Sequence, residues 1–220
     1  MKNIFKSSIG KKIGMALSGV FLIVFLTQHF IINITSVFSE DIFNMLSHFM
    51  GNNPLVQFIL QPVLIAGVLF HFVMGFVLEW QNRKARPVSY AMYKGSRNSM
   101  FVSRNMIISG IVILSFLVLH FYDFWVPEMD YKYIQSLPED PTRYYEELIH
   151  KFENPVRVGL YCLSFIFLAL HLVHGLASST QSLGTNNKYS SAIEKISYAF
   201  GIGIPLGFCF IALYHFFIHL

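Results

Sequence analysis

The stretch FIFLALHLVHG, residues 165–175, decides how the rest of the chain is interpreted. It places His171 and His174 in the middle of an apolar run that begins near Val156. A run of about 20 apolar residues is long enough to cross a bilayer as a helix, and an ionisable side chain inside such a helix is usually functional. Three other long apolar runs carry one histidine each, at His29, His71 and His120. Four helices with an imidazole inside each suggest ligands.

The composition is typical of an integral membrane protein. The chain is 54% hydrophobic and 13% charged, with a mean hydropathy of +0.52, whereas soluble domains carry about 25% charged residues. Cys162 and Cys209 both lie in apolar runs, so the sequence contains no disulfide framework, no paired-cysteine metal motif and no cysteine attachment site for haem. Any haem in this protein is therefore expected to be bound non-covalently.

The hydrophobic runs predict one all-α membrane domain over residues 1–220. Five spans are expected, at residues 12–37, 54–80, 104–126, 155–180 and 196–220. The basic start resembles a signal peptide, but its apolar run is too long, so we take it as the first span. The connection 127–154 is too polar to span, and Asp140-Pro141-Thr142 predicts a short helix around residues 142–152. No internal repeat is apparent.

The basic residues predict the orientation. Twelve of the sixteen Lys and Arg residues lie on one side of the predicted spans. They are found at the start of the chain up to Lys12, between the second and third spans up to Arg104, and between the fourth and fifth spans. The remaining four are Lys132, Arg143, Lys151 and Arg157, on the other side, where acidic residues predominate. By the positive-inside rule the N-terminus is cytoplasmic and connection 127–154 is outside, as for a multi-pass protein of a bacterial cytoplasmic membrane. The net charge of +4 is thus a topology signal, and no nucleic-acid partner is expected.

Two of the histidines are predicted to share a depth in the outer half of the membrane. His29 lies 17 residues beyond Lys12, in a helix that leaves the cytoplasm, and His120 lies 16 residues beyond Arg104 in another such helix. At about 1.5 Å of rise per residue, both lie roughly 24 to 26 Å from the inner boundary.

The other two are predicted to share a depth in the inner half. His71 lies nine residues before Trp80 and twelve before Arg83, and His171 lies nine residues before Thr180, in helices that run inward. Both are therefore roughly 14 to 18 Å from the inner boundary. Two pairs at two depths match two stacked haems, because each six-coordinate haem iron takes two axial ligands on opposite faces of the porphyrin.

Other interpretations of the histidines remain open. A single histidine in a helix is usually a packing residue, and His174, three residues after His171, is the alternative fourth ligand. The remaining histidines, His48, His150, His215 and His219, lie in loops or near helix ends and are not expected to be ligands. A haem-free proton-coupled transporter would also use intramembrane histidines, but transporters tend to show repeated halves and broken helices. A di-metal membrane oxygenase would need several histidine motifs at the same depth near one membrane surface, and the single motif HLVH, residues 171–174, supplies too few ligands.

The segments around these histidines resemble a known family. They are LTQHFIIN at His29, FHFVMG at His71, LVLHFYDFW at His120, and ALHLVHG at His171 followed by Gly184. They are similar to the membrane anchor of succinate:quinone oxidoreductases, including quinol:fumarate reductases, of the type in which one five-helix subunit carries two b haems. The resemblance covers nearly the whole chain. The thirteen-residue step from the family's fourth ligand to a glycine is met by His171 and Gly184, which favours His171 over His174.

The resemblance implies a subunit that transfers electrons between an iron-sulfur subunit and membrane quinone, and menaquinone is the expected type. A flavoprotein subunit would complete the complex on the cytoplasmic side, and the fifth helix would close the bundle or contact a second copy. Cations that would suit haem propionates or subunit docking are Arg83, Arg86, Arg97 and Arg104 on the inner side, and Arg157 near the outer haem. Asp123, three residues after His120, is the candidate for proton exchange with quinone.

Overall fold

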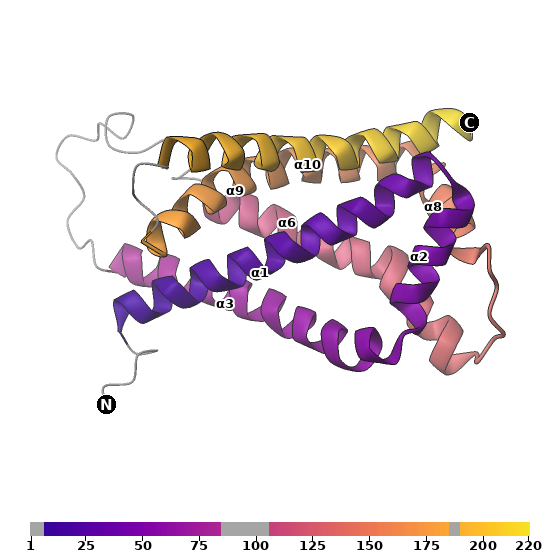
Figure 1. The fold of residues 1–220 in the computed structure, drawn as a ribbon, viewed down its shortest axis with the longest axis horizontal. Helices are drawn as coiled ribbons and strands as arrows, with labels where there is room; N and C mark the ends of the chain where they lie inside the picture. The colour runs from indigo at the N-terminus through magenta and orange to yellow at the C-terminus, as the bar shows by residue number, and fades with distance from the viewer. Residues whose placement is uncertain (1–6, 85–105, 185–189) are drawn as a thin grey trace.

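The computed structural model describes residues 7–84, 106–184 and 190–220, and all regular structure within them is helical (Figure 1). The bounds of the long helices are α1 Ser8–Ile34, α3 Gln61–Lys84, α6 Met106–His120, α9 Pro155–Ser182 and α10 Ser190–Ile218. Short segments extend three of them: η2 Thr35–Val37 follows α1, η3 Val56–Leu60 precedes α3, and η4 Phe121–Trp125, α7 Val126–Met129 and η5 Asp130–Ile134 follow α6. Five helices of this length and apolarity are able to cross a membrane, as predicted for a multi-pass protein.

The third long helix continues further than the sequence indicated. It runs to Ile134 through two π-helical turns, η4 and η5, whereas its span was predicted to end at residue 126. The polar residues after Trp125 thus extend a helix rather than begin a loop. The short helix expected at residues 142–152 is present as α8 Arg143–Phe152. Asp140 Oδ1 accepts hydrogen bonds from the Thr142 amide and hydroxyl, both at 3.0 Å, which fixes the turn that starts α8.

One helix was not anticipated. Helix α2, Glu40–Asn52, lies between the first two spans and has the capping pattern of a helix start. Ser39 Oγ accepts a hydrogen bond from the Ile42 amide at 3.3 Å, and the acidic Glu40 and Asp41 occupy the first turn, where the helix dipole favours negative charge. This signal was present in the sequence, but the segment is too short and polar to stand out in a search for spans.

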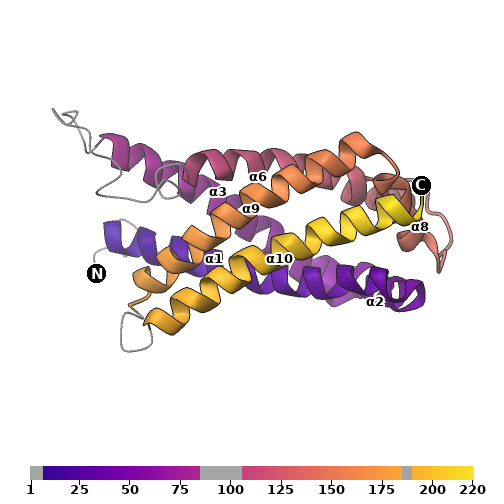
Figure 2. The ribbon, with the colours of Figure 1, turned by 90° about the horizontal axis from the view of Figure 1, so that it is seen from above.

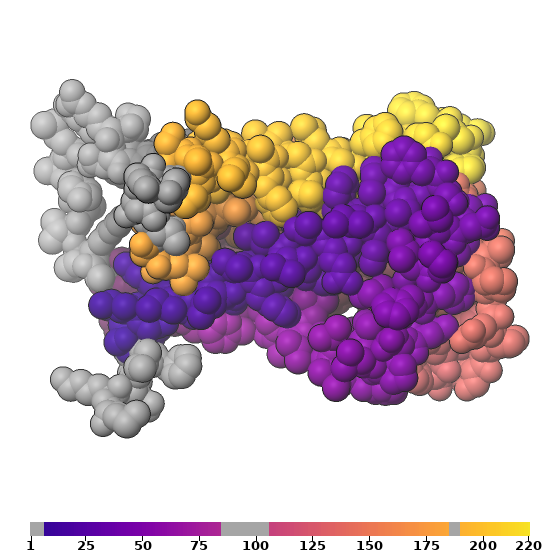
Figure 3. All heavy atoms as spheres, in the orientation of Figure 1, coloured from indigo at the N-terminus to yellow at the C-terminus, as the bar shows by residue number. Residues whose placement is uncertain are grey.

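The bundle has two distinct ends. At the first, which we call the basic end, α1, α6 and α10 begin and α3 and α9 end, at the left of Figure 1. Lys11 Nζ donates to Gln81 Oε1 at 3.2 Å there and joins α1 to α3. At the opposite end, α2 and α8 lie across the bundle, and the space-filling view shows α2 covering it (Figure 3). We call this the capped end.

The four helices that carry the candidate histidines form a closed ring. Helix α1 contacts α3 and α9, and α6 contacts the same two helices, so α1 and α6 face each other across the ring, as do α3 and α9. Helix α10 lies outside the ring against α9 and α1 (Figure 2). Gly201 permits this close approach, because a Cβ there would lie only 2.8 Å from the backbone nitrogen of Val173.

The tightly packed core lies toward the capped end. Its buried members are Phe43, Leu148, Phe152, Val158, Tyr161, Phe165, Phe208, Ile211 and Ala212. The rings of Phe165 and Phe208 stack at 5.4 Å between centroids and join α9 to α10. Many large apolar side chains along the helices are exposed instead, among them Val24, Leu69, Val118 and Leu206. That distribution suits helices whose outer faces meet lipid.

Candidate functional site

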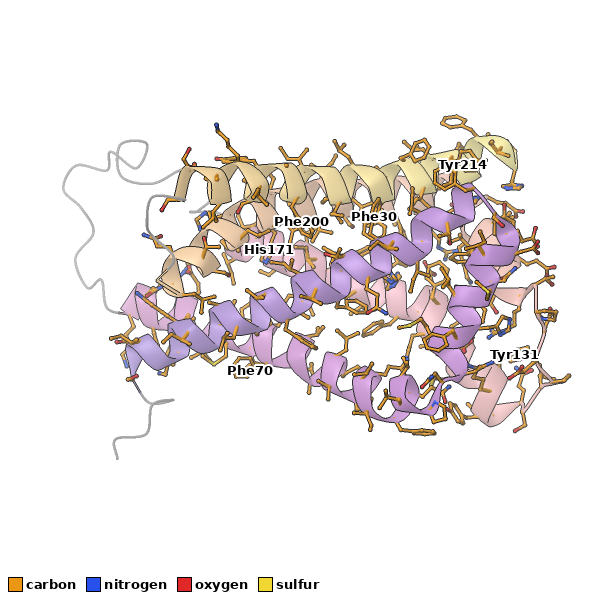
Figure 4. The ribbon with its side chains drawn as sticks, in the orientation of Figure 1. Phe30, Phe70, Tyr131, His171, Phe200 and Tyr214 are labelled. Atoms are coloured by element: carbon orange, nitrogen blue, oxygen red, sulfur yellow. The ribbon has the colours of Figure 1, made fainter. Side chains whose placement is uncertain are left out.

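The structure brings the four candidate histidines together as two pairs across the diagonals of the ring. His29 on α1 and His120 on α6 have ring centroids 5.8 Å apart. His71 on α3 and His171 on α9 have centroids 6.2 Å apart. We call the first the capped-side pair and the second the basic-side pair. Figure 4 shows His171 inside the bundle, nearer the basic end, while Tyr131 lies at the capped end.

The separation within each pair fits two imidazoles on opposite faces of one iron. A metal-bound imidazole nitrogen lies about 2 Å from the metal, so two such rings have centroids roughly 6 Å apart. The interplanar angles of 85° and 69° do not conflict with this arrangement, because each ring can rotate about its own iron–nitrogen axis. Two protein ligands per site are sufficient for haem, whose porphyrin supplies the remaining four nitrogens.

Serine side chains orient both rings of the basic-side pair. Ser18 Oγ donates its proton to the Met15 carbonyl at 2.8 Å, so we assign its 3.1 Å contact with His71 Nδ1 as a hydrogen bond donated by the imidazole. Ser109 Oγ likewise donates to a carbonyl of its own helix at 2.9 Å and lies 3.2 Å from His171 Nδ1. Each imidazole then carries its proton on Nδ1, leaving the Nε2 lone pair free for a metal.

Aromatic rings surround the capped-side pair. Phe25 stacks on His29 at 5.5 Å, and Phe116 stacks on His120 at 5.7 Å; each phenylalanine lies four residues before its histidine. Phe208 of α10 approaches the His29 ring at 5.7 Å. An apolar shell of this kind excludes water from whatever the imidazoles bind.

These contacts reveal an internal repeat that the sequence analysis missed. Residues 18–30 read SGVFLIVFLTQHF and residues 109–121 read SGIVILSFLVLHF. Serine, glycine, phenylalanine and histidine recur at the same spacing, so α1 and α6 each supply one serine to the basic-side pair and one histidine to the capped-side pair. The serine precedes the histidine by eleven residues, which is close to three helical turns and about 16 Å along the axis. The repeat is short and confined to two helices.

Asp123 lies beside the capped-side pair and is fully buried, not solvated as an acid near a helix end usually is. Its Oδ2 accepts a hydrogen bond from the Tyr161 hydroxyl at 2.9 Å and lies 3.1 Å from Arg157 Nε. Asp123 sits in the π turn η4 directly after His120, and π turns are frequent at functional sites. The sequence indicated Asp123 for proton exchange with quinone and Arg157 for a haem propionate, whereas the structure joins the two side chains in one contact. Tyr161 was not anticipated from the sequence.

The remaining candidates have these positions. Arg83 forms an exposed ion pair with Glu79 at 2.6 Å. The other inner arginines, Arg86, Arg97 and Arg104, lie outside the described residues. His174 is half-buried on α9, three residues from His171. Of the histidines not expected to be ligands, His215 is 1% exposed, and its Nε2 is 2.9 Å from Ser36 Oγ.

A buried ionic network joins α7, η5 and α8 at the capped end. Arg143 is ion-paired with Glu128 and, at 2.7 Å, with Glu147. Lys132 Nζ and the Tyr144 hydroxyl also contact Glu128, at 2.5 and 2.7 Å. Burial raises the pKa of Tyr144, and the hydrogen bond to the Glu128 carboxylate raises it further. This network ties the connection between α6 and α9 to the bundle.

No three histidine, cysteine or acidic side chains within the described ranges gather as a metal site would require. The imidazole pairs are therefore the metal-binding candidates that the described residues offer. Comparisons of the chain with family models, with curated proteins and with solved structures found no match.

Proposed function

We propose that this protein is the dihaem cytochrome b membrane anchor of a succinate:quinone oxidoreductase. The observation that supports it best is the presence of two histidine pairs across the diagonals of one ring, separated by about three helical turns. Each pair supplies two imidazoles to one haem b. His29 and His120 would hold the outer haem, and His71 and His171 the inner one.

The chain's own residues provide ligation, orientation and an apolar enclosure. Ser18 and Ser109 hold the basic-side imidazoles in the tautomer that leaves Nε2 free. Phe25 and Phe116 shield the capped-side imidazoles. Haem at each pair would supply one-electron redox chemistry, and the spacing of about 16 Å along the axis suits electron transfer between the two ends of the bundle.

The partners follow from the two ends. The basic end would receive an iron-sulfur subunit and a flavoprotein subunit from the cytoplasm, and the flavoprotein would carry out the dicarboxylate chemistry. Membrane quinone, of the menaquinone type, would react toward the capped end. The exposed Arg83 is one described cation available for docking at the basic end.

Topology tests the orientation independently of haem. A reporter fused after Leu220 is expected to lie outside the cytoplasm, and one inserted near Asn82 is expected to lie inside, because an odd number of spans separates the two ends of the chain. Alkaline phosphatase activity should therefore appear only in the Leu220 fusion, and fluorescence of a cytoplasm-dependent reporter only in the Asn82 insertion. The reverse pattern would invert the proposed docking side.

The visible absorption spectrum of the purified protein tests the function itself. We expect a Soret band and reduced α-band features of b-type haem, and a pyridine haemochrome assay should count two haems per chain. Co-purification of a flavoprotein and an iron-sulfur protein is expected when the chain is isolated from membranes under mild detergent conditions. A protein free of haem after expression with ample haem supply would exclude the proposal and leave the proton-coupled transporter as the surviving candidate.

A further inference from the structure

We propose that Asp123 is a positioning residue for the outer haem, whose Oδ1 accepts a hydrogen bond from Nδ1–H of the ligand His120. This inference rests on the proposed function, because it assigns a partner to one of the haem-binding imidazoles. It makes the two haem sites chemically different, since the capped-side ligand has an anionic partner and the basic-side ligands have neutral serines.

Two buried polar atoms without a partner carry the argument. Within the described residues, His120 Nδ1 and Asp123 Oδ1 are both buried, and neither has a hydrogen-bond partner. A buried polar group left unpaired destabilises the folded protein, and more so when it is charged. A single hydrogen bond from the imidazole to the carboxylate satisfies both atoms at once.

A shared neighbour indicates that the two side chains lie near each other. They are three residues apart along the chain, with Asp123 in the π turn that follows His120. Both also contact the same residue of α9: the Tyr161 ring lies 6.3 Å from the His120 ring between centroids, and the Tyr161 hydroxyl donates to Asp123 Oδ2 at 2.9 Å. Tyr161 thus contacts both the imidazole and the carboxylate from the neighbouring helix α9.

Arg157 gives the carboxylate a cationic partner in this buried position. Its Nε lies 3.1 Å from Asp123 Oδ2, and the pair is joined by the Tyr161 hydroxyl at the same oxygen. Oδ1 is left as the free acceptor. Metal-bound histidines commonly donate their second nitrogen to a carboxylate, which fixes the ring and makes the imidazole a stronger donor to the metal.

Among the described residues, the basic-side imidazoles contact hydroxyl groups instead of a carboxylate. The Nδ1 atoms of His71 and His171 both reach serine hydroxyls, at 3.1 and 3.2 Å. A more strongly donating imidazole stabilises ferric over ferrous iron. Asp123 is therefore expected to lower the midpoint potential of the outer haem relative to the inner one, which would favour electron exchange with a low-potential quinone.

The test is a redox titration of the complex carrying Asp123→Asn, followed optically and by electron paramagnetic resonance. Loss of an outer-shell partner typically changes metal affinity by 10- to 100-fold. A tenfold loss of preference for ferric iron raises the outer potential by about 59 mV for a one-electron couple. We expect that rise in the outer component, a shift of its ferric resonance, and an unchanged inner component.

Three further variants separate the hydrogen bond from other effects. Asp123→Asn leaves the Arg157 cation without its carboxylate partner, and that positive charge alone would raise the potential of the outer haem. The double variant Asp123→Asn/Arg157→Gln removes both charges. It should keep most of the rise in the outer potential if the hydrogen bond causes it. Asp123→Glu, which retains the carboxylate, should restore much of the parent potential. Ser109→Ala is the matched control on the other site and should move only the inner component, by a smaller amount.

The outcomes distinguish this inference from the proposed function. If the parent binds two haems and Asp123→Asn leaves both potentials and the outer ferric resonance unchanged, Asp123 is only a structural ion-pair partner and the inference is wrong. If the double variant returns the outer potential to the parent value, the field of Arg157 explains the shift and the hydrogen bond is excluded. A parent without haem would instead overturn the proposed function.

Discussion

Replacing His29 or His120 with alanine is expected to remove the same haem component, and replacing His71 or His171 is expected to remove the other. Each substitution leaves one iron with a single imidazole in an apolar site, and the rings of each pair lie only 5.8 and 6.2 Å apart. Redox titration of the purified complex should resolve two b-type components in the parent and one in each variant. Haem content per chain should fall from two to one.

His174→Ala is the matched control for the ligand variants. It removes a histidine from the same helix, three residues from His171, while the ring pairs are formed by His29 with His120 and by His71 with His171. Both haem components should persist in this variant. Loss of the same component from His29→Ala and His71→Ala would show that the pairs are wrongly assigned. Loss of a haem from His174→Ala but not from His171→Ala would move the fourth ligand by three residues.

Arg143→Ala is expected to lower the stability of the protein by about 3 kcal/mol, because breaking a buried ion pair leaves an uncompensated charge. The Arg143 side chain is only 8% exposed and pairs with Glu128 and Glu147. Its guanidinium also lies 4.1 Å from the centre of the Tyr131 ring, a cation–π contact that the substitution removes. Lys132 remains beside Glu128 at 2.5 Å, which limits the loss.

An exposed ion pair on the same molecule supplies the control. Arg83 pairs with Glu79, but its side chain is 71% exposed, and exposed pairs contribute about 0 to 1 kcal/mol. Unfolding of the parent, Arg143→Ala and Arg83→Ala in the same detergent, followed by circular dichroism, compares the two directly. Equal stability losses in the two variants would mean that the network at the capped end does not hold the connection to the bundle.

The spans and the depths of the histidines were readable from the sequence because each depends on local chemistry. Lipid requires long helices of apolar residues, so composition alone locates five of them. A constant rise per residue then sets how deep His29, His120, His71 and His171 lie within those helices. The structure places the side chains of equal predicted depth next to each other, while their assignment as haem ligands and the resemblance to succinate:quinone oxidoreductase anchors stay predictions.

Helix ends were predicted less well where the polar sequence was ambiguous. The start of α8 followed from the capping residues near Asp140, since a cap is a local hydrogen bond. The extension of α6 to Ile134 did not, because polar residues favour a loop unless something else pairs them. Here Glu128 and Lys132 belong to the buried network with Arg143, which comes from a different part of the chain.

What only the tertiary structure decided is how the helices are rotated and which distant residues they bring together. The apolar surfaces of these helices give little indication of their inward faces, because a helix surrounded by lipid and other helices is apolar on nearly every side. The serine partners of His71 and His171, and the enclosure of Asp123 by Arg157 and Tyr161, depend on that rotation. The repeat shared by α1 and α6 was present in the sequence, but its role could not be interpreted from the sequence alone. The structure shows that its serine contacts the basic-side pair, while its histidine belongs to the capped-side pair.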